Sequence, residues 1–233
     1  MDHIHENASR IRDRVRAACR RANRCAQEVR IIGVTKTVSV DRIRDGVRAG
    51  IVSLGENYVQ ELHRKAQALE GLGITWHFIG HLQSNKVKAA LRWCEWIQTV
   101  DRESLARELD RQARKLPRRV PVLLQVNVGD ETTKNGVPIA GLLELFRTVE
   151  ALDGLQVKGL MALPPYQEDP EAVRPYFQTM SRLLHALQQE ARVPENLTEL
   201  SMGMSHDFEV AVEEGATMVR IGTALFGPRT TGD

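Results

Sequence analysis

The sequence predicts an α/β protein, built as a single (β/α)8 TIM barrel with one extra helix at the N-terminus. Eight short apolar runs alternate with amphipathic segments along the 233 residues. The connections between them are short, which is typical of repeated strand–helix units in a parallel sheet. A doubly wound open sheet is the alternative, but the glycine-rich fingerprint that such a sheet carries after its first strand is absent.

The extra helix is expected at residues 4–27, before the first strand. Small and apolar side chains recur there at steps of three and four and form one apolar stripe. The stripe consists of Ala8, Ile11, Val15, Ala18 and Ala22. The other sides carry Arg10, Arg12, Arg14, Arg16, Arg20, Arg21 and Arg24. A patch that binds RNA or a membrane is one interpretation of these arginines, and a solvated face balanced by acids elsewhere is the favoured one.

The alternation of strands and helices then continues to the end of the chain. Each expected strand is an apolar run bounded by polar residues, and the fifth is the most apolar and the seventh the weakest. The strands are expected at residues 31–34, 51–54, 76–79, 96–100, 120–126, 155–160, 199–202 and 217–221. The helices are expected at residues 40–49, 57–69, 84–91, 102–116, 139–152, 171–191 and 206–214.

The composition is that of an ordinary globular protein, with 42% hydrophobic and 27% charged residues and a net charge of +2. Such a balance draws the chain to neither nucleic acid nor membrane. Cys19, Cys25 and Cys94 form no CxxC pair, which favours a reducing cytoplasm. No signal peptide or bilayer-spanning run is evident. We therefore expect one cytoplasmic domain over residues 1–233, without nucleic-acid or membrane partners.

A lysine lies at the C-terminal end of the first expected strand, in the segment RIIGVTKT. Inside the strand Lys36 would be costly, because its ammonium would lose water without gaining a partner. At the mouth of a barrel, where active sites lie, partial desolvation would lower its pKa and make the amine a nucleophile toward an aldehyde. The simpler alternative is a lysine that reaches solvent at a strand end.

The loops after the seventh and eighth strands form a candidate phosphate site. Barrels often hold a phosphate between these two loops. Ser201, Gly203 and Ser205 precede a helix whose N–H groups would face that position, and Gly222 and Thr223 supply a second loop. Ordinary turn glycines and a serine N-cap are the alternative. Taken together, and opposite Lys36, the two loops indicate a phosphorylated ligand.

A lysine nucleophile opposite a phosphate site implies a phosphorylated carbonyl compound. Pyridoxal 5′-phosphate (PLP), with Lys36 as its Schiff base, is one candidate, and a sugar phosphate in an aldolase is another. Arg220, on the last strand, would lie where the far side of a pyridine ring falls. Because a guanidinium does not deprotonate, it would keep the ring nitrogen unprotonated and the ring a poor electron sink. A rim ion pair is the alternative for Arg220.

The histidines of the third unit do not form a metal site. His77 and His81 are four residues apart, but one lies on a strand and the other begins a loop, so the helical HExxH geometry is absent. We expect no metal. Two roles are open for His77: stacking on a ligand ring, or acting as a hydrogen-bonded rim residue.

Seven longer motifs run through the chain in the order GVTKT, GENYVQE, WHFIGHLQSNK, QVNVGDETTKNGV, GLMAL, LSMGMS and MVRIGTALFG. In these motifs the chain resembles the pyridoxal phosphate homeostasis proteins, also called the PLPBP or YggS family. The resemblance covers essentially the whole chain. It implies a barrel related to the N-terminal domain of alanine racemase, the fold-type III PLP fold, with PLP bound to Lys36 as an internal aldimine.

The resemblance also assigns further residues to the cofactor. The positions that match family contacts to PLP are Asn57, Ser205, Arg220 and Thr223. Their neighbours, expected to touch PLP through the backbone, are Ser201, Met202, Gly203 and Gly222. His77 is included as a candidate contact from its place on the third strand. Lys134 matches a family loop without a stated role. His206 stands where a small or acidic residue is expected, and there it would alter phosphate affinity or its pH dependence.

The family implies carriage and control of PLP, with no catalytic residue. Racemases and decarboxylases of this fold add a β-rich domain that supplies an acid–base residue, and the chain stops before such a domain. Proton transfer by two bases needs two positioned groups, and only Lys36 is evident. We expect a monomer that serves PLP-dependent apo-enzymes. A fold-type III amino-acid racemase or decarboxylase is the alternative, and an RNA- or protein-binding module is a weaker one.

Overall fold

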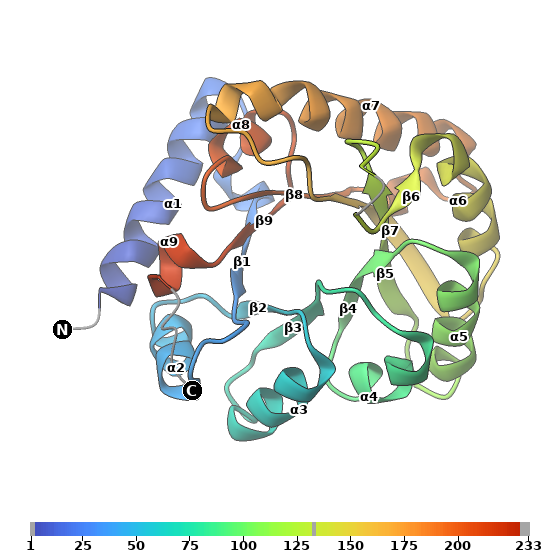
Figure 1. Cartoon of the computed structure of the whole chain (residues 1–233), viewed down its shortest axis with the longest axis horizontal. Helices are drawn as coiled ribbons and strands as arrows, with labels where there is room; N and C mark the ends of the chain where they lie inside the picture. The colour runs from blue at the N-terminus through green and yellow to red at the C-terminus, as the bar shows by residue number, and fades with distance from the viewer. Residues whose placement is uncertain (1–2, 132–133, 229–233) are drawn as a thin grey trace.

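Eight parallel strands close into a barrel in this computed structural model, which describes residues 3–131 and 134–228 (Figure 1). Thr132 and Thr133 of the ETTKNG segment lie outside the described residues. Around the ring the strands follow the chain, and β1 pairs with β9 to complete it. The bounds are β1 (Arg30–Val34), β2 (Ser53–Glu56), β3 (Thr75–Phe78), β4 (Trp96–Val100), β5 (Val120–Asn127), β7 (Leu155–Ala162), β8 (Glu199–Met204) and β9 (Met218–Ile221). The expected TIM barrel is confirmed.

Helices surround the barrel and bury the outward-facing side chains of the strands (Figure 1). Their bounds are α1 (Ile4–Arg21), α2 (Val40–Arg48), α3 (Val59–Ala68), α4 (Val87–Leu91), α5 (Glu103–Ala113), α6 (Leu142–Glu150), α7 (Arg174–Glu190), α8 (Phe208–Glu213) and α9 (Thr223–Phe226). A smaller group of apolar side chains fills the inside of the ring. It consists of Ile32, Leu123, Met161 and Met218, with Trp96 and Leu163 against them.

Three elements differ from the sequence prediction. The first helix ends at Arg21 and not near residue 27, because Asn23 takes a left-handed conformation (φ 52°). Arg24 then donates to the carbonyls of Val212 and Ala216, which draws the chain onto the barrel. The two-residue strand β6 (Val137–Pro138) and the one-turn helix α9 were not predicted, because both are too short to show a periodic pattern.

The strand register places three loops at one end of the barrel. Gly33 of β1 lies opposite Ile221 of β9, and Arg220 of β9 lies opposite Met204 of β8. The loops that follow β1, β8 and β9 are therefore neighbours, although about 190 residues separate the first from the last. These are the loops in which the sequence analysis expects the lysine and the phosphate site.

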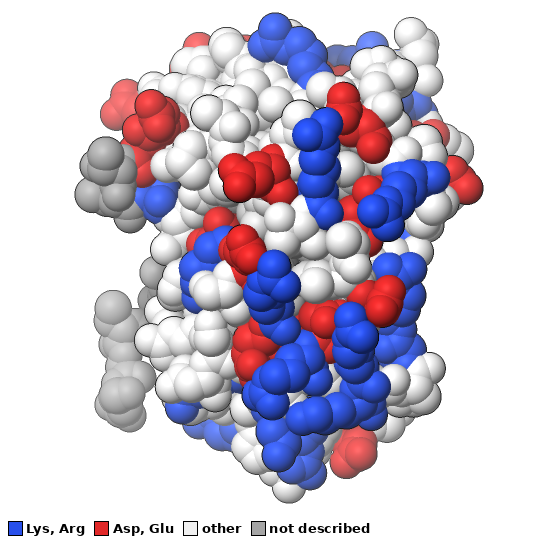
Figure 2. Space-filling model, turned by 90° about the vertical axis from the view of Figure 1, so that its right-hand side faces the viewer, with Lys and Arg blue, Asp and Glu red and all other residues white. Residues whose placement is uncertain are grey.

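The arginines of α1 are mostly engaged within the protein. Five of the seven arginines between residues 10 and 24 bond to carboxylates or to backbone carbonyls. On α5 three arginines likewise pair with acids one turn away. The face that includes α5 shows basic and acidic side chains intermixed, with basic ones gathered toward its lower edge (Figure 2). The bonds made by the arginines between residues 10 and 24 support the interpretation of these arginines as a balanced, solvated face.

No helix in the described ranges is long and apolar enough to cross a membrane. The longest, α1, carries charged side chains on all but its buried stripe.

Replacing Gly159 with alanine should disrupt the pairing of β7 with β8. The residue has φ 151°, and an added Cβ would lie 1.8 Å from the Glu199 carbonyl oxygen. We expect Gly159→Ala to lower the free energy of unfolding by about 3 kcal/mol or more, because the partner strand must move. Urea unfolding followed by circular dichroism measures this. Gly71→Ala is the control: its φ is 83° but nothing lies within 4 Å, so a loss of only about 1 kcal/mol is expected. Equal losses would contradict the steric explanation.

Candidate functional site

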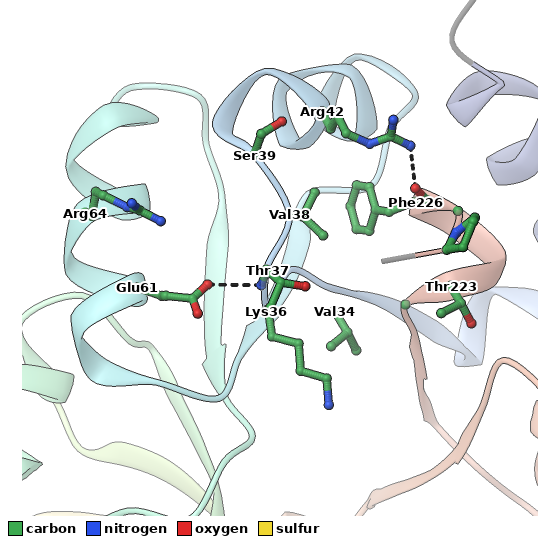
Figure 3. Close-up of a pocket in the computed structure, with 13 residues that line it drawn as sticks. Val34, Lys36, Thr37, Val38, Ser39, Arg42, Glu61, Arg64, Thr223 and Phe226 are labelled. Carbon is green, nitrogen blue, oxygen red and sulfur yellow. Dashed lines mark hydrogen bonds between the residues drawn. The ribbon is translucent and has the colours of Figure 1, made fainter. Parts of the chain in front are cut away.

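A cavity of about 670 Å³ opens beside the C-terminal end of β1 (Figure 3). Of the predicted site residues, Lys36, Gly222 and Thr223 line it. Side chains from α2 and α3 form its outer wall, and the sequence analysis had not selected them. They are Ser39, Arg42, Glu61 and Arg64. The loops after β1 and β9, which are distant in sequence, thus share one cavity with side chains of α3.

Lys36 lies in a tight turn directly after β1. The turn is closed by a 2.9 Å bond from the Val38 N–H to the Thr35 carbonyl. Its third residue, Thr37, has φ 63°, a left-handed conformation that is rare for a β-branched side chain. Lys36 is half-buried, and its side chain extends away from Glu61 and Arg64, past Val34 (Figure 3). Backbone strain of this kind persists only where neighbouring contacts hold it.

A buried ion cluster holds this turn from below. The ammonium of Lys65 donates to the Thr35 carbonyl, to Glu56 Oε1 and to Glu61 Oε2, each at 2.6 Å. All three of its protons are therefore bonded. Glu61 also accepts from the N–H of Thr37 at 3.1 Å, which fixes the strained residue. Lys65 is fully buried, so it supports Lys36 and does not compete with it as an accessible amine.

The electrostatics of Glu61 reflect this cluster. Burial raises the pKa of its carboxyl, but the hydrogen bonds from Lys65 and from the Thr37 N–H outweigh burial, and the net shift is downward. Glu61 is therefore ionised, as an acceptor of two donors must be.

Arg220 lies inside the barrel, and among the described residues no carboxylate pairs with it. Its guanidinium donates to Ser201 Oγ and to the Ala162 carbonyl, both at 2.7 Å. Burial lowers its pKa to about 10, while the charge of Asp207 opposes that shift. Among the described residues, these contacts do not include the ion pair at the rim that was the alternative for Arg220. Arg220 is a buried cation, and these two bonds engage two of the five N–H donors of its guanidinium.

The loops after β8 and β9 contact each other. Ser205 Oγ accepts from the Ala224 N–H at 3.3 Å. Gly222 lines the cavity, and an added Cβ there would make ordinary van der Waals contact with Val34, at 3.6 Å. Gly203 has a different role: its φ is 87° and a Cβ would lie 2.6 Å from Ala211, so close packing of α8 requires glycine there. The cavity beside Gly222 and the hydroxyls of Ser205 and Thr223 suit an anion.

Seven predicted residues do not line the cavity: Ser201, Gly203, Ser205 and Arg220, described above, and Met202, Asn57 and His77. The Met202 side chain is buried against the surrounding helices. Asn57 follows β2, and its buried Oδ1 has no hydrogen-bond partner among the described residues. His77 is fully buried within the barrel, where its ring stacks on Trp96 with the centroids 5.6 Å apart. A contact between His77 and a ligand stays a prediction.

The two residues without an assigned role both tie loops together. His206 Nε2 lies 2.9 Å from the Glu168 carbonyl oxygen, and its ring packs on Tyr166. Lys134 donates to the Pro164 carbonyl at 3.2 Å and pairs with Glu131. Each side chain is thus directed to the loop that follows β7.

Comparison with known proteins agrees with this geometry. The sequence model of the alanine racemase N-terminal domain matches residues 7–230. The pyridoxal phosphate homeostasis protein of Aquifex aeolicus is 48% identical over 224 residues, covering 96% of this chain and 97% of that protein. The chain belongs to the pyridoxal phosphate homeostasis protein family.

A further relative and a solved structure support the assignment. The pyridoxal phosphate homeostasis protein of Escherichia coli K12 is 39% identical over 233 residues, covering 98% of both chains. The solved structure of PipY from Synechococcus elongatus PCC7942, with PLP bound, has a TM-score of 0.84 and 36% identity. It covers 96% of this chain and 100% of PipY. The family and fold inferred from the sequence motifs are confirmed.

Several supporting residues of this family member escaped the sequence analysis. Glu56 and Glu61 lie in the GENYVQE motif, and Lys65 follows Glu61 by one helical turn, a spacing typical of an ion pair. Gln98 is a polar residue within the apolar run Trp96–Val100, which is a signal for an inward-facing polar group. That Lys65 is buried could not have been inferred, because lysines at such spacing are usually exposed.

His77 should make stability depend on pH. Burial, helped by the charge of Arg30, lowers its pKa from 6.5 to about 3. Below the unfolded value the unfolded chain binds a proton that the folded chain does not. The free energy of unfolding should therefore fall between about pH 6.5 and pH 3, by about 1.4 kcal/mol per pH unit from this residue.

The variant His77→Phe keeps a ring on Trp96 and should remove this component of the pH dependence. Urea unfolding between about pH 7.5 and pH 4.5 gives the slope of the free energy of unfolding against pH for each protein. The slopes are compared because the hydrogen bond lost in the variant lowers the free energy of unfolding by the same amount at every pH. His185→Gln, at an exposed position on α7, should retain the parental slope. A His77→Phe profile parallel to the parent would show that His77 is protonated inside the fold.

Proposed function

We propose that this protein binds PLP reversibly through Lys36 and serves in the homeostasis of the cofactor. The observation that carries the proposal is the position of Lys36 in a strained, supported turn, in the cavity that Gly222 also lines and next to the strand that carries Arg220. The solved PipY structure, with PLP bound, and the names of the relatives support the same ligand.

The residues at the mouth fit PLP in their chemistry. PLP supplies an aldehyde that links covalently and reversibly to a primary amine. Lys36 provides that amine. Ser205, Gly222 and Thr223 offer hydroxyls, N–H groups and space for the phosphate. The buried guanidinium of Arg220, which lacks a carboxylate partner among the described residues, suits a ring nitrogen. The orphaned Oδ1 of Asn57 is available to accept from a further polar group of the ligand.

Arg220 favours holding over turnover. A guanidinium only donates hydrogen bonds and stays protonated, so it does not supply the ring nitrogen with a proton. The ring then withdraws electrons weakly. Lys65, which donates to the carbonyl of the residue before Lys36, has all three protons bonded and is no second base. We therefore infer a carrier without robust catalysis. We further infer a cytoplasmic monomer that delivers PLP to PLP-dependent apo-enzymes.

Lys36→Ala should abolish covalent PLP binding, because no other amine is held at this position. The purified parent should be yellow after addition of PLP, and borohydride should make the link permanent. Mass spectrometry of the digested protein should then find the adduct on Lys36. Lys88→Ala, at an exposed site on α4, is the matched control and should retain the adduct. An adduct on another lysine, or none at all, would overturn the proposal.

The alternative of an amino-acid racemase or decarboxylase makes a separate prediction. Such an enzyme exchanges the α-proton of its substrate far faster than free PLP does. We expect no exchange above that of free PLP across a panel of amino acids in deuterated solvent, because we propose a protein that holds PLP and assign no second base to act with Lys36. Nuclear magnetic resonance of the amino acids measures the exchange. An α-proton exchange rate that exceeds that of free PLP and is lost in Lys36→Ala would instead establish catalysis.

A further inference from the structure

A chain of buried polar side chains runs from Arg220 into the centre of the barrel. Arg220 donates to Ser201 Oγ at 2.7 Å, and Ser201 Oγ donates to Gln98 Oε1 at 2.7 Å. Gln98 Nε2 lies 3.0 Å from His77 Nδ1 and 3.4 Å from Met218 Sδ. Each of the four polar residues is at most 3% exposed. The groups come from β9, β8, β4 and β3, so the chain connects four strands.

The direction of every bond in this chain follows from Arg220. A guanidinium has no acceptor, so Ser201 must accept from it and is left to pass its own proton to Gln98. Gln98 then presents its oxygen to Ser201 and its amide N–H groups to His77 and Met218. Flipping the amide would leave the Ser201 proton without an acceptor and would place an oxygen against the Met218 sulfur. The hydrogen bonds of these side chains therefore all run in one direction, with each donor on the side of the barrel mouth and each acceptor further inward.

The last member of the chain is forced into one protonation state. Because His77 Nδ1 accepts from Gln98, its single proton must lie on Nε2. That atom is buried and has no hydrogen-bond partner among the described residues. Stacking on Trp96 fixes the plane of the ring. An unpaired buried donor costs free energy, and such costs are retained where they serve a function.

We propose that Gln98 and His77 are positioning residues that hold the Arg220 guanidinium in one orientation, through Ser201, for the ligand at the barrel mouth. The proposal rests on the proposed function, in which the Arg220 guanidinium contacts the ring nitrogen of PLP. His77 thus acts through Arg220 and not by touching the cofactor. A change in the hydrogen bonding of Arg220 should therefore affect the His77 imidazole, because each hydrogen bond in this series orients the next.

The imidazole nitrogens of His77 report on the chain directly. In the ¹⁵N spectrum of the protein without PLP, His77 should be neutral and protonated at Nε2 at neutral pH. Adding PLP should shift these signals, since Arg220 gains a partner. A proton on Nδ1, or a doubly protonated ring, overturns the proposal. So do unchanged His77 signals in protein whose Lys36 has bound PLP.

A variant tests the effect on binding. Gln98→Met keeps the volume but breaks the chain, and should weaken PLP binding about tenfold, the value of one hydrogen bond to a charged group. Thr99→Val is the matched control: Thr99 is the next residue on β4, is 2% exposed, and has a buried hydroxyl without a partner among the described residues. It should bind PLP as the parent does. Equal affinities of the two variants overturn the proposal.

The two proposals fail in different ways. If the parent binds no PLP, the proposed function falls, while the protonation state of His77 still shows whether the inward chain exists. If the parent binds PLP on Lys36 and Gln98→Met binds equally well in a protein that melts like Thr99→Val, only the positioning role falls.

Discussion

The pairing of β1 with β9 is the contact on which the site depends. It joins Arg30, Ile31, Ile32 and Gly33 to the segment Met218–Ile221, near opposite ends of the chain. Only this pairing brings the Lys36 turn against Gly222 and Thr223. It also places Arg220 one strand away from the lysine and opposite Met204 of β8. The barrel is therefore more than a support, because its closure assembles the functional groups.

The second requirement is a rigid anchor for Lys36. A threonine with a left-handed backbone is unfavourable, and three bonds from one buried ammonium hold the surrounding turn in place. Burying an ion cluster seldom adds net stability compared with apolar packing. Its benefit here is a lysine whose backbone is fixed while its side chain extends toward the mouth. Stability and binding geometry are thus set by the same few residues.

The barrel could be predicted because its strands are apolar runs of ordinary length, separated by helices with a periodic apolar face. The Lys36 turn and the loops with Ser205 and Gly222 follow from the rule that barrel sites lie at the C-terminal ends of strands. The end of α1 was misplaced, since its boundary depends on Asn23 and on tertiary bonds from Arg24. The ion cluster of Lys65, Glu56 and Glu61 was not predicted either, because it also depends on tertiary contacts.

Side chains that act at a distance leave little trace in a sequence. Lys65 and Glu56 acquire their roles only when α3 packs beneath the β1 turn, and burial reverses the usual expectation for a lysine. A ligand contact of His77, predicted from its place on β3, stays a prediction. Its ring packs on Trp96 and lies at the inner end of a hydrogen-bond chain. Only the register of β3 and β4 decides which way that ring faces.

The closure of the ring by β9 also affects how the protein is made. During synthesis on the ribosome, Lys36 emerges well before Arg220, Gly222 and Thr223, which follow it far along the chain. A nascent chain that lacks β9 has an open sheet edge at β1 and no complete binding site. Any ligand held at this mouth can therefore bind fully only after β9 has emerged and paired with β1, and it then stabilises the closed ring rather than a partly formed one.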